Sequence, residues 1–585
     1  MTPCANVSAT AKDLQVILPD GQSIWRTVIA IAFVLLLAVV LGFHYRTAKA
    51  ELGSDLLGYD QARHYVTGVM TFDYLRYGLG SNPLKFAESY YVRYPKVTMG
   101  HWPPLYYGVQ ALWYFATRPS PVSLRVLSAF VSVATAVVLF RRAKVRYGWH
   151  IAFLGAILFL ALPSVQIFSW DAMAEALLAF LVFLAAYALA DLLKKPSLQS
   201  ALWFVCWAVL AVLTKGSAWS LGLGLILAPL LAGCFRFYRS TWYWASGAGI
   251  ALLGAPFYVL VSKLKLNYHV DVVAALGRQT PVSGPASLGP LTDVVPLSVL
   301  SVAVIGLGAA LYSRLFKRSD DLAHTEALAL AACVLSQVVF LAFLPLTFEG
   351  RYYFPSVAPL VILFLEGVRQ IQLWCTAAAP RLAAAIPVAA VAATVTSVGA
   401  VQTCPAAGYR AACPGQGYSA AMAAVASRRR GPIILVASDV FGEGALVAAQ
   451  LARDSARSSV VLDARQVLVS YQPSGGEYHP VKMNVGQILQ FLNETPVNYV
   501  IVEEAPWTGR SGELIHQTLQ DPRFDFSLRG RVPVTRAGGS ETGSLLLFEN
   551  RSAGDRYPTN IQVTLGPGRG LRQMQLSLSS TVSLN

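Results

Sequence analysis

Long apolar segments alternate with short polar ones over about the first 400 residues of this 585-residue chain. A segment of about 20 apolar residues crosses the hydrocarbon core of a bilayer as an α-helix. The segment 103–117 is also apolar, but about 15 residues are short for a crossing, so we expect it to lie at the membrane surface or to re-enter. About eleven segments meet the length criterion, near 25–43, 122–140, 150–168, 172–192, 199–214, 218–234, 242–262, 292–313, 324–346, 355–373 and 383–402.

The pattern changes after residue 402. Short runs rich in β-branched and aliphatic residues alternate there with two helical patterns, at 443–455 and 485–494. Strands that alternate with helices predict a small α/β domain, at 403–550, and the polar segment 551–585 is predicted to be a flexible tail. The predicted strands are PIILVA at 432–437, SSVVLD at 458–463, NYVIVE at 498–503 and SLLLF at 544–548.

Composition supports a polytopic α-helical membrane protein with a C-terminal α/β domain. The chain is 55% hydrophobic and 13% charged, with a mean hydropathy of +0.50, whereas soluble domains have about 25% charged residues. A net charge of +15 would suit nucleic-acid binding. The basic residues stand instead in short clusters between apolar segments, which is the positive-inside pattern of membrane proteins. Nucleic acid is therefore not an expected partner.

These basic clusters also predict the orientation. Every second loop is basic and is expected to face the cytoplasm, for example 141–146 and 194–195. The segment 1–24 is then cytoplasmic, 25–402 is the transmembrane domain with an outward loop at 44–121, and the α/β domain is extracytoplasmic. We expect a multi-pass protein of the inner (cytoplasmic) membrane. About 24 residues precede the first apolar segment, so it is interpreted as an uncleaved anchor and not as a signal peptide.

Four outward-facing segments hold ionisable side chains that membrane packing does not require. Each residue has a structural alternative when taken singly: Lys215 and Arg351 as headgroup contacts, Asp171 and Glu175 as helix-end charges, Asp60 as a solvated loop acid. Ionisable groups that converge on one leaflet nevertheless favour an active site. The segments are GYDQARHYVTG at 58–68, followed in the same loop by HWPPLYYG at 101–108, then SWDAMAEALL at 169–178, LTKGSAW at 213–219 and FEGRYYFP at 348–355.

The order and sidedness of these motifs resemble the GT-C superfamily of integral membrane glycosyltransferases, in particular its protein O-mannosyltransferase and aminoarabinose transferase branch. The resemblance covers roughly residues 20–400. It implies a GT-C type fold and an enzyme that moves a sugar from a polyprenyl-phosphate-linked donor to a lipid, glycan or protein acceptor outside the membrane, within the cell envelope. A single displacement would invert the anomeric configuration. The sugar and the acceptor stay open.

The resemblance also assigns roles. Asp60 matches the first acid of the D-E-x-x-Y motif and becomes the candidate general base. Gln61 stands in place of the second acid of that motif, so no cofactor is certain and the use of a divalent metal stays undecided. Glu175 fits the second acidic motif better than Asp171, and both remain candidate catalytic residues.

The phosphate of the donor needs cations, and the arginine fork suits it best. Lys215 matches the lysine of the LTKG motif and Arg351 the arginine of the E-x-RY motif, and Arg63 is the third candidate. His101, or less well Lys96, stands for the basic residue before PPLYY. The predicted substrate-binding residues are Arg63, His64, His101, Lys215, Glu349, Arg351 and Tyr352.

The competing class is a transporter or flippase for a lipid-linked or anionic substrate, in which the same cations would bind a phosphate in transit. Transporters are commonly built from repeated halves with broken helices. The sequence shows no such repeat, and a long outward loop with an acid near its start suits catalysis better.

Overall fold

The computed structural model describes residues 55–263, 289–316, 322–342, 350–378, 385–392 and 416–577, apart from short gaps within these ranges. Six described helical segments are long and apolar enough to cross a membrane, and two shorter apolar ones accompany them. The protein is therefore a multi-pass membrane protein. The six segments are α5 (Pro121–Ala161), α7 (Glu175–Lys194), α10 (Thr241–Lys263), α13 (Leu297–Leu315), α14 (Leu322–Ala342) and η4 (Gly350–Ser356) with α15 (Val357–Ala378); the shorter ones are α8 (Leu198–Val212) and η2 (Gly216–Trp219) with α9 (Ser220–Leu231).

Most of the predicted spans coincide with helices. The seven from 172–192 to 355–373 fall on α7, α8, α9, α10, α13, α14 and α15. The predicted span 25–43 and most of 383–402 lie outside the described residues, so the total of eleven crossings stays a prediction. Two further short elements, η3 (Phe235–Arg239) and α12 (Gly289–Val294), flank α10 and α13.

The predicted spans 122–140 and 150–168 occupy α5 and the short α6 (Pro163–Trp170). The 41 residues of α5 are interrupted at Gly148, which has φ 80 and ψ 172, a conformation that glycine adopts readily. Ser128, before this break, donates to the backbone oxygen of Asp171, after it, over 2.8 Å. Ser128 precedes Gly148 and Asp171 follows it, each by a length of chain that would span about 30 Å as a helix. The chain therefore turns back at Gly148 and α5 contains two passes.

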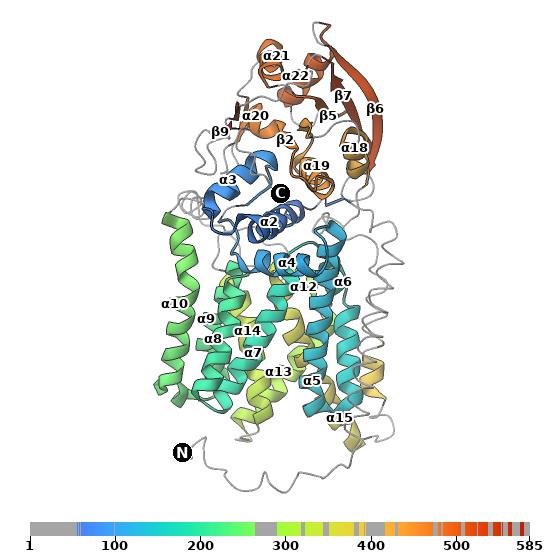
Figure 1. The fold of residues 1–585 in the computed structure, drawn as a ribbon. Helices are drawn as coiled ribbons and strands as arrows, with labels where there is room; N and C mark the ends of the chain where they lie inside the picture. The colour runs from blue at the N-terminus through green and yellow to red at the C-terminus, as the bar shows by residue number, and fades with distance from the viewer. Residues whose placement is uncertain are drawn as a thin grey trace.

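The loop that is predicted to face outward, which we call the outward loop, forms a layer at one end of the helix bundle (Figure 1). It consists of α2 (Gln61–Asp73), a short π-helix η1 (Tyr74–Gly78), α3 (Pro83–Arg93) and α4 (Leu105–Ala116). With 12 residues, α4 is too short to cross a bilayer, and it lies across the end of the bundle (Figure 1). The expectation that 103–117 does not cross agrees with this placement.

The C-terminal part contains a five-stranded sheet in the order β2-β1-β5-β7-β6. β1 is parallel to β2 and β5, whereas β7 is antiparallel to β5 and β6. We call residues 416–550 the α/β unit. Its strands are β1 (Ile433–Ala437), β2 (Val460–Asp463), β5 (Tyr499–Glu503), β6 (Phe526–Thr535) and β7 (Thr542–Asn550), with a β3 (Val469–Tyr471) and β4 (Tyr478–Pro480) pair; its helices are α18 (Tyr418–Ala426), α19 (Val440–Arg453), α20 (Ala464–Val467), α21 (Val485–Glu494) and α22 (Gly509–Gln520).

The four predicted strands correspond to β1, β2, β5 and β7, and both predicted helices correspond to α19 and α21. Strand β6 was missed because FSLRGRVPVT carries two arginines and a proline and lies partly exposed at the sheet edge. A further antiparallel pair, β8 (Asn560–Val563) and β9 (Met574–Ser577), lies within the segment 551–585 that was predicted to be a tail. The domain boundaries stay predictions.

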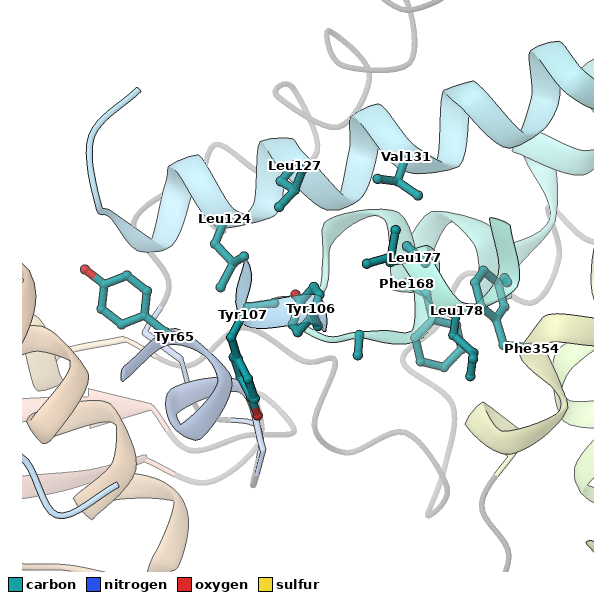
Figure 2. Packing of buried hydrophobic residues seen from close by; sticks show 14 of the residues in the cluster. Tyr65, Tyr106, Tyr107, Leu124, Leu127, Val131, Phe168, Leu177, Leu178 and Phe354 are labelled. Carbon is teal, nitrogen blue, oxygen red and sulfur yellow. The ribbon is translucent and has the colours of Figure 1, made fainter. Parts of the chain in front are cut away.

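Three layers stack along the long axis in Figure 1: the helix bundle, then α2, α3 and α4, then the α/β unit. Figure 2 shows that the buried side chains of the middle layer continue into those of the bundle. The loop and the bundle therefore share one core, which fixes α4 on the membrane helices. The side chains in view include Tyr65, Tyr106, Tyr107, Leu124, Leu127, Val131, Phe168, Leu177, Leu178 and Phe354.

The bundle is held closely at the crossing of α13 and α15, where two glycines allow backbone contact. A Cβ atom at Gly306 would lie 2.2 Å from the carbonyl oxygen of Leu363, and one at Gly367 would lie 2.0 Å from that of Val302. Such distances do not occur between real atoms, so only glycine fits at either position. Small residues serve the same purpose in membrane helix pairs generally.

We expect Gly306→Ala to destabilise the protein by about 1–3 kcal/mol, because the helices must separate to admit the methyl group. Thermal unfolding in detergent measures the effect. Gly308→Ala is the matched control, since a Cβ at Gly308 meets nothing within 4 Å, and we expect it to leave the unfolding temperature unchanged or slightly raised. Equal unfolding temperatures for the two variants would contradict the close crossing.

Candidate active site

Two buried acid–cation pairs lie where the outward loop meets the bundle. Asp60 accepts a hydrogen bond from Nη1 of Arg351 over 2.9 Å, and Glu175 accepts one from Nζ of Lys215 over 2.6 Å. The carboxylates are the more buried partners, with side chains 8% exposed for Asp60 and 1% for Glu175. All four residues come from the segments that the sequence singled out.

Local structure explains why these side chains point into one space. Asp60 and Glu175 stand at the N-terminal ends of α2 and α7, where the helix dipole favours negative charge. Asp60 does not cap its own helix with its side chain, which leaves the carboxylate available to Arg351. Lys215 lies in extended backbone between α8 and η2, and Arg351 lies in η4 just before α15.

The ring of Tyr352 lies close to both cations. Its ring centroid is 4.8 Å from Nζ of Lys215 and 5.4 Å from Cζ of Arg351. Its backbone oxygen accepts from Nε2 of Gln337 over 3.1 Å, and Gln337 in turn accepts from Ser220 over 2.6 Å. Both cations thus contact one aromatic ring, and side chains of α9 and α14 hold the backbone that carries it.

His64, one turn along α2 from Asp60, is buried and held by aromatic rings. Its Nδ1 lies 3.1 Å from the hydroxyl of Tyr107, and its ring centroid is 4.3 Å from that of Trp102. Burial lowers the pKa of His64 to about 4, although Asp60 and Glu175 oppose the shift. The imidazole is therefore neutral at pH 7 and contributes hydrogen bonds, not charge.

The ionisation of Asp60 is set by two opposed effects. Burial alone would raise the pKa of this carboxyl, but the positive charge of Arg351 and, more weakly, that of Arg63 hold the pKa below its usual value. Asp60 is consequently a carboxylate at pH 7. Arg63 is itself buried, 9% exposed, and lies on the same helix as His64.

Asp171 behaves differently from the other acids. Burial, reinforced by the nearby charge of Glu175, raises the pKa of Asp171 to about 7, against the opposing charges of Arg125 and Arg351. Oδ1 of Asp171 and Oε2 of Glu175 are buried and have no hydrogen-bond partner among the described residues. The structure places both acids near one another and leaves both as candidates for the second acid.

The remaining predicted site residues lie further out or are not described. His101 packs edge-on against Trp102, with ring centroids 4.2 Å apart, and so stands behind the ring that contacts His64. Lys96, the weaker match for the basic residue before PPLYY, is paired with Asp463 of the α/β unit over 2.7 Å. Glu349 lies outside the described residues.

The described residues include no group of three or more His, Cys, Asp or Glu side chains arranged for a metal ion. The carboxylate of Asp60 is engaged by Arg351, and Gln61 supplies an amide where a second carboxylate would stand. Use of a divalent metal stays undecided, and the reaction proposed for the site uses side chains alone.

Sequence reasoning missed two polar supports of the site, the threonine pair Thr67 and Thr98 and the amide of Gln337. Thr67 and Thr98 share a hydrogen bond of 3.0 Å, and Thr98 lies 3.4 Å from the hydroxyl of Tyr107. Threonines carry no distinctive signal in a loop, so nothing marked these two. Gln337 is the other support; a lone amide in the apolar segment 324–346 was a signal that could have indicated it.

No protein-family model and no curated protein sequence matches the chain. Comparison with solved structures gives a different result. ArnT from Cupriavidus metallidurans in the apo state superposes with a TM-score of 0.54 at 13% identity, over 90% of this chain and all of ArnT. The chain shares the fold of this ArnT structure. ArnT bound to undecaprenyl phosphate gives a TM-score of 0.53 at 13% identity, over 91% of this chain and 100% of that one.

The likeness confirms the fold suggested by the motifs and extends beyond them. The motifs covered roughly residues 20–400, whereas the superposition covers 90% of the chain. At 13% identity it establishes the fold alone, so the chemistry of the site has to be argued from its residues.

Proposed function

We propose that the protein is a glycosyltransferase that moves a sugar from a polyprenyl-phosphate-linked donor to an acceptor on the outer face of the cytoplasmic membrane. The observation that carries this proposal is the pair of partly buried cations, Arg351 and Lys215, both near the ring of Tyr352 and each beside a buried carboxylate. A reaction on the outer face implies an orientation in which the N-terminus is cytoplasmic and the α/β unit is extracytoplasmic. The fold shared with an ArnT structure that holds undecaprenyl phosphate supports this class of donor.

The cations bind the phosphate by exchanging partners. Arg351 and Lys215 are each neutralised by an acid before the donor arrives, and a phosphodiester oxygen replaces that acid as hydrogen-bond acceptor. Arg351 makes the stronger contribution because its guanidinium fork matches two phosphate oxygens, whereas Lys215 acts as a point charge. The rings around His64 and Tyr352 give the sugar an apolar wall.

Donor binding also activates the base. Arg351 holds the pKa of Asp60 low, and a carboxyl with a low pKa is a weak base. Once the phosphate engages Arg351, burial dominates and the pKa of Asp60 rises. Asp60 then takes the proton of the acceptor hydroxyl while the hydroxyl oxygen bonds to the anomeric carbon. The bond between that carbon and the phosphate oxygen breaks, polyprenyl phosphate leaves, and the configuration inverts.

Purified protein in detergent tests the proposal. Radiolabelled polyprenyl-phosphate sugars are supplied one at a time, together with a cell-envelope extract that contains lipids, glycans and proteins. We expect label to appear on one envelope component, with release of one polyprenyl phosphate per sugar transferred. The same protein is also reconstituted into sealed vesicles. Label that crosses these vesicles without release of polyprenyl phosphate would indicate a transporter or flippase and would overturn the proposal.

The pKa of about 7 at Asp171 predicts a pH dependence of donor binding. Above pH 7 Asp171 is negative and repels the phosphate; below pH 7 it is neutral. The donor phosphodiester keeps a single negative charge throughout this range, so we expect the donor KM to fall as pH decreases from about 8 to 6. A unit charge about 10 Å away at an effective dielectric of about 20 corresponds to about a 10-fold change.

Initial rates at several pH values measure this effect in the wild type and in Asp171→Asn. The asparagine variant cannot ionise, so we expect its donor KM to be low and independent of pH. The same pH dependence in both proteins would assign the titration to another group.

A further inference from the structure

Three charged side chains of the outward loop are buried against the α/β unit. They are Asp55, just before α2, Asp73, the last residue of α2, and Lys96, beyond α3. Their relative exposures are 6%, 3% and 5%. Each makes polar contacts with a residue more than 350 positions further along the chain. The two parts are thus joined by buried charges on both sides of the helix that begins at Asp60.

The strongest contact is at the C-terminal end of α2. Asp73 accepts from Nε of Arg457 over 2.7 Å and from the hydroxyl of Tyr90 over 2.8 Å. The guanidinium of Arg457 is oriented by the backbone oxygens of Leu451 and Asp454. Arg457 also has φ 53, so the backbone turns in a left-handed conformation to present this side chain.

Lys96 forms the second contact, at the carboxyl ends of the parallel strands. Its Nζ lies 2.7 Å from Asp463, the last residue of β2, and 3.6 Å from Glu443 in α19. In α/β folds this edge of the sheet is the usual place for a ligand. Here a lysine of the chain's own loop occupies it.

The third contact lies before α2. Asp55 accepts hydrogen bonds from the backbone nitrogens of Tyr418 and Ser419, over 2.8 and 3.0 Å, at the start of α18. Between these contacts α19 packs directly on α2, where a Cβ at Gly444 would lie 3.1 Å from the Cβ of Ala62. Figure 1 shows α2 lying between α19 and α4.

Buried ion pairs are a weak source of stability, because desolvation offsets most of the attraction; their best-attested use is to fix a geometry. The geometry in question here is that of α2. This helix carries Asp60, Arg63 and His64, and Asp60 must remain within hydrogen-bond reach of the acceptor. On the side of the bundle α2 packs on α4, and Asp60 reaches Arg351 there. On the opposite side α2 packs on α19 of the α/β unit (Figure 1).

We propose that the α/β unit is a positioning element that presses α2 onto the membrane helices, with Arg457 as the positioning residue that keeps Asp60 in register with the site. Asp73 transmits the contact at one end of α2, and Lys96 and Asp55 hold the segments that flank it. The role assigned to Asp60 rests on the proposed function, whereas the docking of α2 does not.

The first experiment compares Arg457→Ala with Arg457→Lys and with Arg529→Ala. Arg529 is the matched control, since it forms an ion pair with Glu549 in the same unit, with its side chain 40% exposed. We expect Arg457→Ala to lower kcat by about 10- to 100-fold, because a displacement of about 1 Å at a catalytic group can cost about 100-fold. The donor KM is expected to stay within about 2-fold of the wild type. Arg457→Lys is expected to recover part of kcat, and Arg529→Ala to match the wild type.

Hydrogen exchange gives a readout that does not depend on catalysis. In Arg457→Ala we expect amides of residues 61–73 to exchange faster, while those of the membrane helices are unchanged. If Arg457→Ala does not yield folded protein, Lys96→Met replaces it in the same comparison, with the same expectation for residues 61–73.

A crosslink then separates positioning from general damage. Cysteines introduced as Ala62→Cys and Gly444→Cys are close enough to form a disulfide after a small adjustment, because disulfides have Cβ atoms about 3.8 Å apart. In the Arg457→Ala background we expect oxidation of this cysteine pair to restore at least half of the lost kcat, and reduction to abolish the gain.

The outcomes are distinguishable. Unchanged exchange over 61–73 in folded Arg457→Ala overturns the positioning role whatever the enzyme does, and so does a loss of kcat that the crosslink fails to recover. Wild-type protein that transfers no sugar, with faster exchange in Arg457→Ala, overturns the proposed function and leaves the docking of α2 standing.

Discussion

Asp60→Asn is expected to lower kcat for sugar transfer by about 10²–10⁴-fold, the usual contribution of a general base. Asparagine keeps the shape of the side chain and an oxygen that can accept from Arg351, but it cannot take a proton at neutral pH. Removal of the negative charge also leaves Arg351 free of its ion pair with Asp60. We therefore expect the donor KM to stay the same or to fall, so that the defect lies in kcat.

Steady-state rates with varied donor and saturating acceptor separate the two parameters. Asp191→Asn is a suitable control, because Asp191 also pairs with an arginine, Arg142, over 3.1 Å, but is 42% exposed near the other end of α7. We expect that control to retain wild-type kcat. An Asp60→Asn protein with undiminished kcat would move the general base elsewhere, to Asp171 or Glu175.

The convergence of the site could be predicted from the sequence because it depends on topology. Asp60, Glu175, Lys215 and Arg351 follow apolar segments of countable length, so their common side of the membrane is fixed by alternation. Which acid pairs with which cation could not be predicted. Asp60 and Arg351 are 291 residues apart, and a choice between Arg351 and Lys215 depends on how α2 lies on the bundle.

The α/β unit likewise has features that could be predicted from the sequence and features that could not. Its buried strands β1, β2 and β5 are continuous aliphatic runs and were recognisable, whereas β6 alternates exposed arginines with partly buried residues and was not. The docking of the α/β unit on the outward loop cannot be recognised from any local pattern in the sequence. Arg457 and Asp73 are common residues in ordinary surroundings, 384 positions apart, and only the folded chain brings them within 2.7 Å.

At the site and at the docking contact of α2, the carboxylate of each ion pair is more buried than its cation. At the site, each carboxylate is more buried than its cation: 8% against 19% exposed for Asp60 and Arg351, and 1% against 12% for Glu175 and Lys215. The cations therefore face the more open side, from which an anionic ligand arrives. At the docking contact of α2 the carboxylate is again the more buried partner, with 4% of the Asp73 side chain exposed against 11% of the Arg457 side chain.

Arg351→Ala is expected to raise the donor KM by about 10- to 100-fold, since a hydrogen bond to a charged group contributes about 1.5–3 kcal/mol and each 1.4 kcal/mol is a factor of ten. Arg351→Lys keeps the charge but loses the fork, so we expect an intermediate KM. The control is Arg142→Ala, whose side chain is 42% exposed and pairs with Asp191. A normal donor KM in Arg351→Ala, with only kcat reduced, would remove Arg351 from the phosphate site.

A double variant decides whether Arg351 and Lys215 hold the same phosphate. Cations that bind separate groups contribute independently, so the changes in binding free energy for Arg351→Ala and Lys215→Met would add. Cations that share one phosphate are coupled, because each orients the group for the other, and contacting residues usually show coupling of about 0.5–3 kcal/mol. We expect the second substitution to weaken donor binding less once the first is present. Strict additivity would mean that Lys215 and Arg351 act on separate groups of the donor and do not share one phosphate.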